Sequence, residues 1–233
     1  MKILALETST EYCSVALWRD GAIDGRSENV GQKHSELLIA MLRELLDAAG
    51  LAIKDIDGIA YGSGPGSFTG VRIACGVAQG LALGAGLPVF GVCTLQALAE
   101  GAGRDRVIAA LDARMGEIYC AAYERSAGVW IAICEPCLCR PEDAPLPPGE
   151  GWFGAGSGFA AFEDALQARY AGKLTGADSE AVPDAFAIAA IASLQFSNGK
   201  GQDAAQAQPF YLRDKVAFKT AERERMAAGK SAA

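Results

Sequence analysis

The sequence predicts an α/β protein of two related lobes. Strand-like and helix-like segments alternate along its 233 residues, and 51% of these are hydrophobic, which is enough for one large core or two small ones. A β-hairpin with an acidic residue at its tip lies near the N-terminus, and a hairpin of the same design returns near the middle of the chain. We therefore expect a first lobe over residues 1–103, a smaller related lobe over 104–213 and a flexible tail over 214–233.

The two hairpins carry their acidic residues at equivalent positions. Their strands are expected over residues 2–7, 13–18, 107–112 and 117–124. Glu7 ends the first strand of one hairpin and is followed by three hydroxyl residues, and Asp112 ends the first strand of the other. This correspondence indicates two lobes that are built alike.

Two helices with distinctive surfaces are expected between the hairpins, over residues 33–49 and 69–83. The first helix has a broad apolar face, which includes Leu38, Met41, Leu42 and Leu45. On the second helix small residues recur at every fourth position, and the glycines among them are Gly76, Gly80 and Gly84. Such surfaces favour close helix-to-helix packing, either between the two helices or with a second protein.

A glycine-rich segment over residues 62–70 follows a strand expected over 56–61 and opens the second helix. Its glycines let backbone N–H groups converge on an anion, and Ser67 or Thr69 can cap the helix. The same glycines can instead form a tight strand-to-helix turn that permits close packing. The segment lacks the lysine and the glycine spacing of known phosphate loops.

Short apolar runs and turn residues predict the remaining elements. Strands are expected over 87–92 and 129–134, and helices over 94–102, 159–170 and 185–196. Asp184 is expected to cap the last helix. A proline-rich loop over 141–148, a glycine turn over 154–158 and a closing segment over 209–213 complete the expected ordered chain.

The polar composition argues against several classes of protein. His34 is the only histidine, so neither a Ser-His-Asp triad nor a zinc or iron hydrolase site is expected. Cys134, Cys137 and Cys139 lack a nearby fourth zinc ligand, and seven scattered cysteines suit a reducing compartment. The net charge of −7 argues against a broad nucleic-acid surface. We see no signal peptide and no long uninterrupted apolar run, and expect a cytoplasmic protein without membrane contact.

One polar constellation has two interpretations. Glu7 and Asp112 can face each other across a cleft between the lobes and hold a magnesium nucleotide, or Glu7 can simply accept hydrogen bonds from the N–H groups of its own turn. Arg72, one turn into the second helix, can meet an anion or a carboxylate of a partner. The possible remnant anion or nucleotide site comprises Glu7, Thr8, Ser9, Gly66, Ser67 and Asp112.

Four motifs, in order over nearly the whole chain, resemble those of one family. They are Ile3-Leu4-Ala5-Leu6-Glu7-Thr8-Ser9, Gly64-Pro65-Gly66-Ser67-Phe68-Thr69-Gly70-Val71-Arg72, Leu111-Asp112-Ala113-Arg114-Met115-Gly116-Glu117-Ile118-Tyr119 and Tyr211-Leu212-Arg213. They resemble the TsaB family, bacterial partner proteins in the synthesis of N6-threonylcarbamoyladenosine in tRNA. The resemblance implies the actin-like and Hsp70-like ATPase (ASKHA) fold, with mixed sheets flanked by helices, and common descent with the catalytic protein TsaD.

The chain departs from TsaD where TsaD-like proteins bind metal. Those proteins carry a His-x-x-x-His pair after the strand that follows the glycine-rich helix, and here Thr94 and Leu98 stand at those positions. Neither side chain is a strong metal ligand, so the resemblance implies a noncatalytic protein without a cofactor. An ATP-dependent enzyme that uses Glu7 and Asp112 is the alternative, and a peptidase is the weakest interpretation.

The resemblance also implies partners. The chain would be a scaffold and activator of TsaD, joined to it through a helical interface, with TsaE docking on the pair and TsaC supplying threonylcarbamoyl-adenylate. The modified base lies at position 37 of tRNAs that read codons starting with A, and the chain would meet tRNA only through the complex. Without TsaD we expect a homodimer. The expected interface residues are Leu38, Met41, Leu42 and Leu45 on the first helix and Arg72, Cys75, Gly76, Gln79 and Gly80 on the second.

Overall fold

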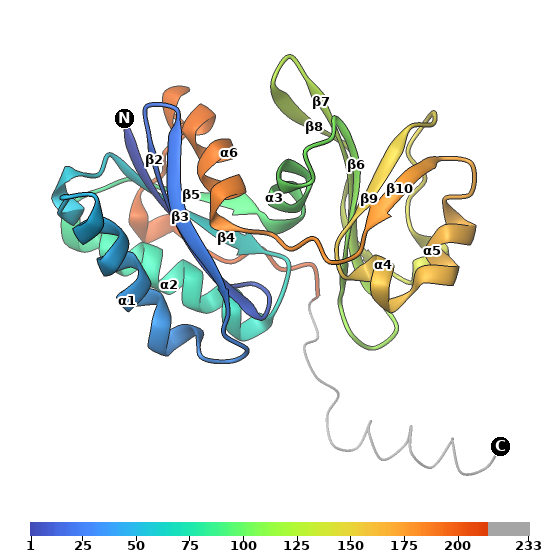
Figure 1. The fold of residues 1–233 in the computed structure, drawn as a ribbon, viewed down its shortest axis with the longest axis horizontal. Helices are drawn as coiled ribbons and strands as arrows, with labels where there is room; N and C mark the ends of the chain where they lie inside the picture. Colours follow the sequence, from blue (N-terminus) through green and yellow to red (C-terminus); the bar gives the residue numbers. More distant parts are fainter. Residues whose placement is uncertain (214–233) are drawn as a thin grey trace, which may run out of the picture.

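The computed structural model describes residues 1–213, which form two lobes, each built on a five-stranded sheet (Figure 1). The expected tail over 214–233 lies outside the described residues. The first sheet consists of β1 (Lys2–Glu7), β2 (Tyr12–Arg19), β3 (Ala22–Asn29), β4 (Gly58–Gly64) and β5 (Val89–Cys93). Its strand order is β3-β2-β1-β4-β5, in which β1, β2 and β3 are antiparallel and β4 and β5 run parallel to β1.

The second sheet repeats this arrangement. It consists of β6 (Arg106–Asp112), β7 (Ile118–Ser126), β8 (Val129–Cys139), β9 (Trp152–Ala155) and β10 (Leu174–Asp178). Its order is β10-β9-β6-β7-β8, with β6, β7 and β8 antiparallel and β9 and β10 parallel to β6. Because β6 takes the place of β1 and β7 that of β2, the predicted α/β fold of two related lobes is confirmed. Strands β3, β9 and β10 were not predicted.

Most predicted helices are present. They are α1 (His34–Ala48), α2 (Phe68–Ala85), α3 (Thr94–Gly101), α4 (Gly158–Ala161), α5 (Glu163–Arg169) and α6 (Ala185–Ser197), with the short helices η1 (Ile53–Asp55), η2 (Pro141–Asp143) and η3 (Ala204–Gln206). Ser67 caps α2 and Asp184 caps α6 through their side chains, as expected. The single helix predicted over 159–170 is instead α4 and α5, because Phe162 leaves the helical region with φ −138°.

Helices cover both faces of the first sheet (Figure 1). Helices α1 and α2 bury their apolar side chains on one face, and α6 packs on the other. By length and composition alone α2 is long and apolar enough to span a membrane, although Arg72 and Gln79 interrupt its apolar run, as the sequence predicts. Ala74, Ala78 and Ala82 of this helix are nevertheless buried in the core beneath it.

Two helices cross the expected boundaries between the lobes. Helix α6 lies within residues 104–213 but packs against β1 and β2 of the first sheet, so the second lobe ends near β10 and the expected range is too long. Helix α3 lies before residue 104 but packs against β6 and β7, and its Glu100 accepts a hydrogen bond from Nε1 of Trp130 in β8 at 2.6 Å. One helix from each half of the sequence therefore packs on the sheet of the other lobe, and these contacts link the two lobes.

Candidate functional site

The apolar face of α1 belongs to the core of the first lobe. Of the residues expected there at a partner interface, none is more than 8% exposed, and Leu42 is 2% exposed; they are Leu38, Met41, Leu42 and Leu45. The expectation that these side chains form an exposed surface is wrong. Periodicity located the apolar face correctly, but the sheet of the same chain covers it. A charged residue at Leu42 would therefore destabilise the monomer itself.

The expected residues of α2 fall into two groups. Cys75 is buried, and Gln79 is half-buried with its Nε2 donating to the carbonyl of Ala204 at 3.1 Å, so neither is free for a partner. Arg72, Gly76 and Gly80 are exposed. A Cβ atom built on Gly76 or Gly80 meets no atom within 4 Å, so the outer surface of the helix is open at these positions.

An apolar groove runs between α1, η1 and α2. It encloses a cavity of about 240 Å³, and its apolar lining is Leu4, Ile39, Leu42, Leu46, Leu51, Ala52, Ile53 and Leu81. Arg43 and Asp47 of α1 also line it. Ile39 in the lining of the groove is 50% exposed, and Leu83 near the end of α2 is 57% exposed. Sequence periodicity missed Ile39 and Leu83 because both lie off the main apolar faces.

The tip of the first hairpin is packed into the glycine-rich segment. The Oγ1 of Thr8 donates to the carbonyl of Gly70 at 2.7 Å, and the carbonyl of Ser9 accepts from the N–H of Ser67 at 2.7 Å. A Cβ on Gly66 would lie 2.6 Å from the Cβ of Ser9. The glycines therefore serve close packing, and a backbone N–H that an anion would need is already bonded within the protein.

Glu7 lies inside this contact. Its side chain is 1% exposed, one carboxylate oxygen accepts from the N–H of Ser9, and a Cβ on Gly62 would overlap the other oxygen. That other oxygen, Oε2, has no hydrogen-bond partner among the described residues, and neither has the Oγ of Ser9. Burial raises the pKa of Glu7 from 4.5 to about 7, because desolvation disfavours the ionised form; the charge of Asp184 acts in the same direction.

Asp112 is not brought into a pair with Glu7. It ends β6 in the other lobe, where its carboxylate lies 3.1 Å from Nη1 of Arg114 and its own N–H donates to the Oγ of Ser157. Of the residues expected at a remnant anion site, the structure thus gathers Glu7, Thr8, Ser9, Gly66 and Ser67 in one packed contact, without Asp112. The turn interpretation of Glu7 agrees with this geometry.

The histidine and the two positions at which the sequence predicts no metal ligand, Thr94 and Leu98, have structural contacts. Nε2 of His34 lies 3.1 Å from the carbonyl oxygen of Tyr12, and the ring is buried. Thr94 is buried and its Oγ1 donates to the carbonyl of Pro65, and Leu98 is part of the core around α3. Within residues 1–213, no group of three or more His, Cys, Asp and Glu side chains is arranged to hold a metal ion.

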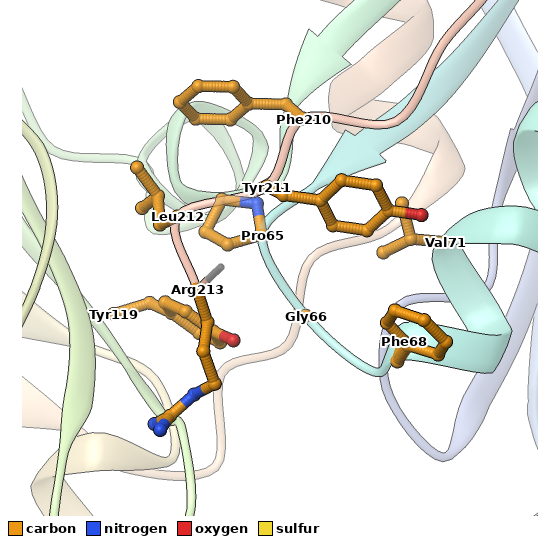
Figure 2. Close-up of a pocket in the computed structure, with 9 residues that line it drawn as sticks. All are labelled: Pro65, Gly66, Phe68, Val71, Tyr119, Phe210, Tyr211, Leu212 and Arg213. Atoms are coloured by element: carbon orange, nitrogen blue, oxygen red, sulfur yellow. The ribbon is translucent and has the colours of Figure 1, made fainter. Parts of the chain in front are cut away.

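Residues 210–213 connect the two lobes, and we call this segment the strap. Figure 2 shows Tyr211, Leu212 and Arg213 passing over Pro65 and Gly66 toward Tyr119 of the second lobe. The N–H of Phe210 donates to the carbonyl of Ser63 at 2.7 Å. The pocket here has a cavity volume of about 30 Å³, room for one or two waters and far below the ~300 Å³ of common ligand sites.

Arg213 anchors this strap on the second lobe. Its Nη2 lies 2.6 Å from Oε2 of Glu117 and donates to the carbonyl of Ala113 at 3.1 Å, and its side chain is 14% exposed. Arg213→Ala is expected to lower the free energy of unfolding in urea by about 1–2 kcal/mol, because a charged, largely buried hydrogen-bonded pair is lost. The exposed Arg140 supplies the control, and Arg140→Ala should change stability by less than ~0.5 kcal/mol. Equal effects of the two changes would mean that the strap does not hold the lobes together.

Relatives of this chain are found among proteins of one pathway. The family model described as "TsaD: tRNA N6-adenosine threonylcarbamoyltransferase" matches residues 27–220. The chain is 42% identical over 231 residues to the "tRNA threonylcarbamoyladenosine biosynthesis protein TsaB" of Escherichia coli, covering 94% of this chain and 97% of that one. It is 36% identical to the protein of the same description from Haemophilus influenzae, covering 94% and 96%. The solved structure "YeaZ from Pseudomonas aeruginosa" superposes with a TM-score of 0.84 at 40% identity, covering 91% of this chain and 99% of that one.

Proposed function

The chain belongs to the TsaB family of tRNA threonylcarbamoyladenosine biosynthesis proteins, and we propose that within this pathway it is the noncatalytic partner that holds TsaD in its active arrangement. The observation that carries the proposal is the open surface of α2, where Gly76 and Gly80 leave room for another helix. Glycine inside a helix costs about 1 kcal/mol relative to alanine, and close helix packing offsets that cost.

The common fold supports a match between this surface and TsaD. A family model named for TsaD matches residues 27–220, so TsaD has elements equivalent to α1 and α2. Two similar helix pairs can pack against each other about a pseudo-twofold axis, as identical surfaces do in a symmetric dimer. The groove beside Ile39 and the exposed Leu83 then provide apolar area for that contact. In the absence of TsaD a second copy of the chain can occupy the same surface.

The noncatalytic role is supported by the side chains at the equivalent metal positions. Thr94 and Leu98 are buried in structural contacts and are not metal ligands. The net charge of −7 favours a subunit that leaves tRNA binding to its partner. TsaE would join the assembled pair, and the reaction would take place on TsaD.

The test places a charged side chain on the open surface. Gly80→Glu should leave the monomer folded, because the position is exposed and a Cβ there meets no atom within 4 Å, but should weaken binding to TsaD from the same organism at least 100-fold in isothermal titration. The control is Gly101→Glu, the same change at an exposed glycine of α3 that also has open space around it. We expect its affinity for TsaD to equal that of the wild type.

Two results would contradict this proposal. Unchanged affinity of Gly80→Glu for TsaD would place the interface elsewhere. Tight magnesium-dependent binding of ATP by the isolated chain, without affinity for TsaD, would instead support the ATP-dependent alternative and would require the packed hairpin tip around Glu7 to open.

A further inference from the structure

Two cysteines of β8 form a close pair of thiols in the second lobe. Cys137 and Cys139 are half-buried, and their Sγ atoms share a hydrogen bond over 4.0 Å. Residues two apart on a strand project to the same face of the sheet. Both thiols therefore lie together against the apolar core of this lobe.

The two thiols differ in the direction in which their pKa values are shifted. The hydrogen bond that the two thiols share lowers the pKa of Cys137 and raises the pKa of Cys139. Burial raises the pKa of the neighbouring Cys120, whose Sγ lies 3.5 Å from the hydroxyl of Tyr170, to about 12. Burial also raises the pKa of Cys134. The thiolate therefore forms more readily at Cys137 than at Cys120, Cys134 or Cys139, and Cys139 is the thiol that shares a hydrogen bond with it.

Closure of the pair requires a change in the backbone of β8, which lies at the edge of the sheet. Strand β8 is an edge strand that is hydrogen-bonded only to β7 within the described sheet. The pairing register shifts between Cys120 and Ala122, so the strand bulges between Cys134 and Cys137, directly beside the pair, whereas Cys137 and Cys139 themselves pair regularly with Cys120 and Ile118. Cα atoms two residues apart in a strand lie about 6.6–6.8 Å apart, at the upper end of the range that a disulfide spans. The two Sγ atoms, 4.0 Å apart, must approach to about 2.05 Å, so closure requires a local bend of this edge strand that brings the two Cβ atoms within about 4.5 Å of each other.

We propose that Cys137 and Cys139 are a reversible oxidation site, a vicinal dithiol that a peroxide converts to an intramolecular disulfide. The Cys137 thiolate attacks one peroxide oxygen, the O–O bond breaks, and after protonation the second oxygen leaves as water, which leaves a sulfenic acid on Cys137. The sulfur of Cys139 then attacks that of Cys137, the S–O bond breaks, and the thiol proton leaves with the oxygen as a second water. Two thiols are oxidised and one peroxide is reduced to two waters.

The experiment treats the full chain with hydrogen peroxide and maps the cysteines by differential alkylation and mass spectrometry. The wild type should lose two free thiols and two hydrogens, the cross-link should join residues 137 and 139, and dithiothreitol should reverse it. Before oxidation, phenylarsine oxide, which binds paired thiols, should block the same two cysteines. Cys137→Ser and Cys139→Ser should each abolish both the cross-link and the protection.

Cys134→Ser is the matched control, because it changes a half-buried cysteine of the same strand and leaves the pair intact. It should behave as the wild type does. A cross-link between other cysteines, or irreversible oxidation of Cys137 with no loss of the Cys139 thiol, would overturn the proposal. Because mapping of the wild-type protein decides this point alone, a serine variant that fails to fold does not leave the question open.

Discussion

Gly70→Ala is expected to lower the free energy of unfolding by about 3 kcal/mol, although alanine is normally favoured over glycine in a helix by about 1 kcal/mol. Gly70 lies in the first turn of α2, and a Cβ built on it would lie only 1.9 Å from the carbonyl oxygen of Thr8. That oxygen belongs to the backbone, and Thr8 is fully buried and bonded back to the carbonyl of Gly70. The methyl group can therefore be accommodated only if the hairpin tip and the helix move apart.

The same helix supplies the control for this change. Gly76→Ala adds the same methyl group where no atom lies within 4 Å, so it should raise the free energy of unfolding by up to ~1 kcal/mol. Urea denaturation followed by circular dichroism measures both variants. If the two alanine variants had equal stability, the hairpin tip would not be packed against α2, and the anion interpretation of the glycine-rich segment would regain support.

The contrast between these glycines shows what a sequence pattern leaves open. A glycine-rich turn before a helix serves anion binding and close packing equally well, because both require the absence of a Cβ. The interatomic distances distinguish the two roles. They place Thr8 against Gly70 and Ser9 against Gly66, which indicates close packing. At Gly76 the same residue type leaves an exposed surface open instead.

The fold was predictable wherever residues repeat or alternate strongly. The apolar strands that end at Glu7 and Asp112 proved to be β1 and β6, at equivalent places in two sheets of equivalent order. Strand β3 was missed because its eight residues are mostly exposed and polar, so that pairing with β2 defines it more than burial does. Strands β9 and β10 are short and contain glycine, which makes their local signal weak.

Periodicity also leaves open which neighbour covers an apolar face. On α1 the strongest apolar face, around Leu42, is covered by the sheet of the same lobe. The surface open to a partner is marked by Ile39, by Leu83 and by glycines, a pattern too sparse to stand out in a sequence. In the same way, the sequence predicts α6 as a strongly apolar helix but not that it returns to the first sheet.

Glu7→Gln is expected to stabilise the protein by about 3 kcal/mol above pH 8 and to have little effect near pH 5. The folded protein holds the proton of Glu7 up to about pH 7, whereas the unfolded chain releases it near pH 4.5. The folded state therefore binds more protons between these values, and the free energy of unfolding of the wild type falls as the pH rises through this window. A pKa raised from 4.5 to about 7 corresponds to roughly 3 kcal/mol. Glutamine keeps the acceptor for the N–H of Ser9 and removes the ionisation.

Urea denaturation at intervals from pH 5 to above pH 8 measures the difference in stability between the two proteins. All other titrating groups, including Asp184 beside Glu7, contribute to both curves and cancel from this difference. Glu11→Gln, at an exposed position of the same hairpin tip, serves as the control and should change stability by less than ~0.5 kcal/mol at either end. A difference for Glu7→Gln that does not grow with pH would mean that the carboxylate stays ionised inside the folded protein. The unpaired Oε2 of an ionised Glu7 would then require a cation or a hydrogen-bond donor that the hairpin tip does not provide. That result would support the nucleotide-dependent role of Glu7.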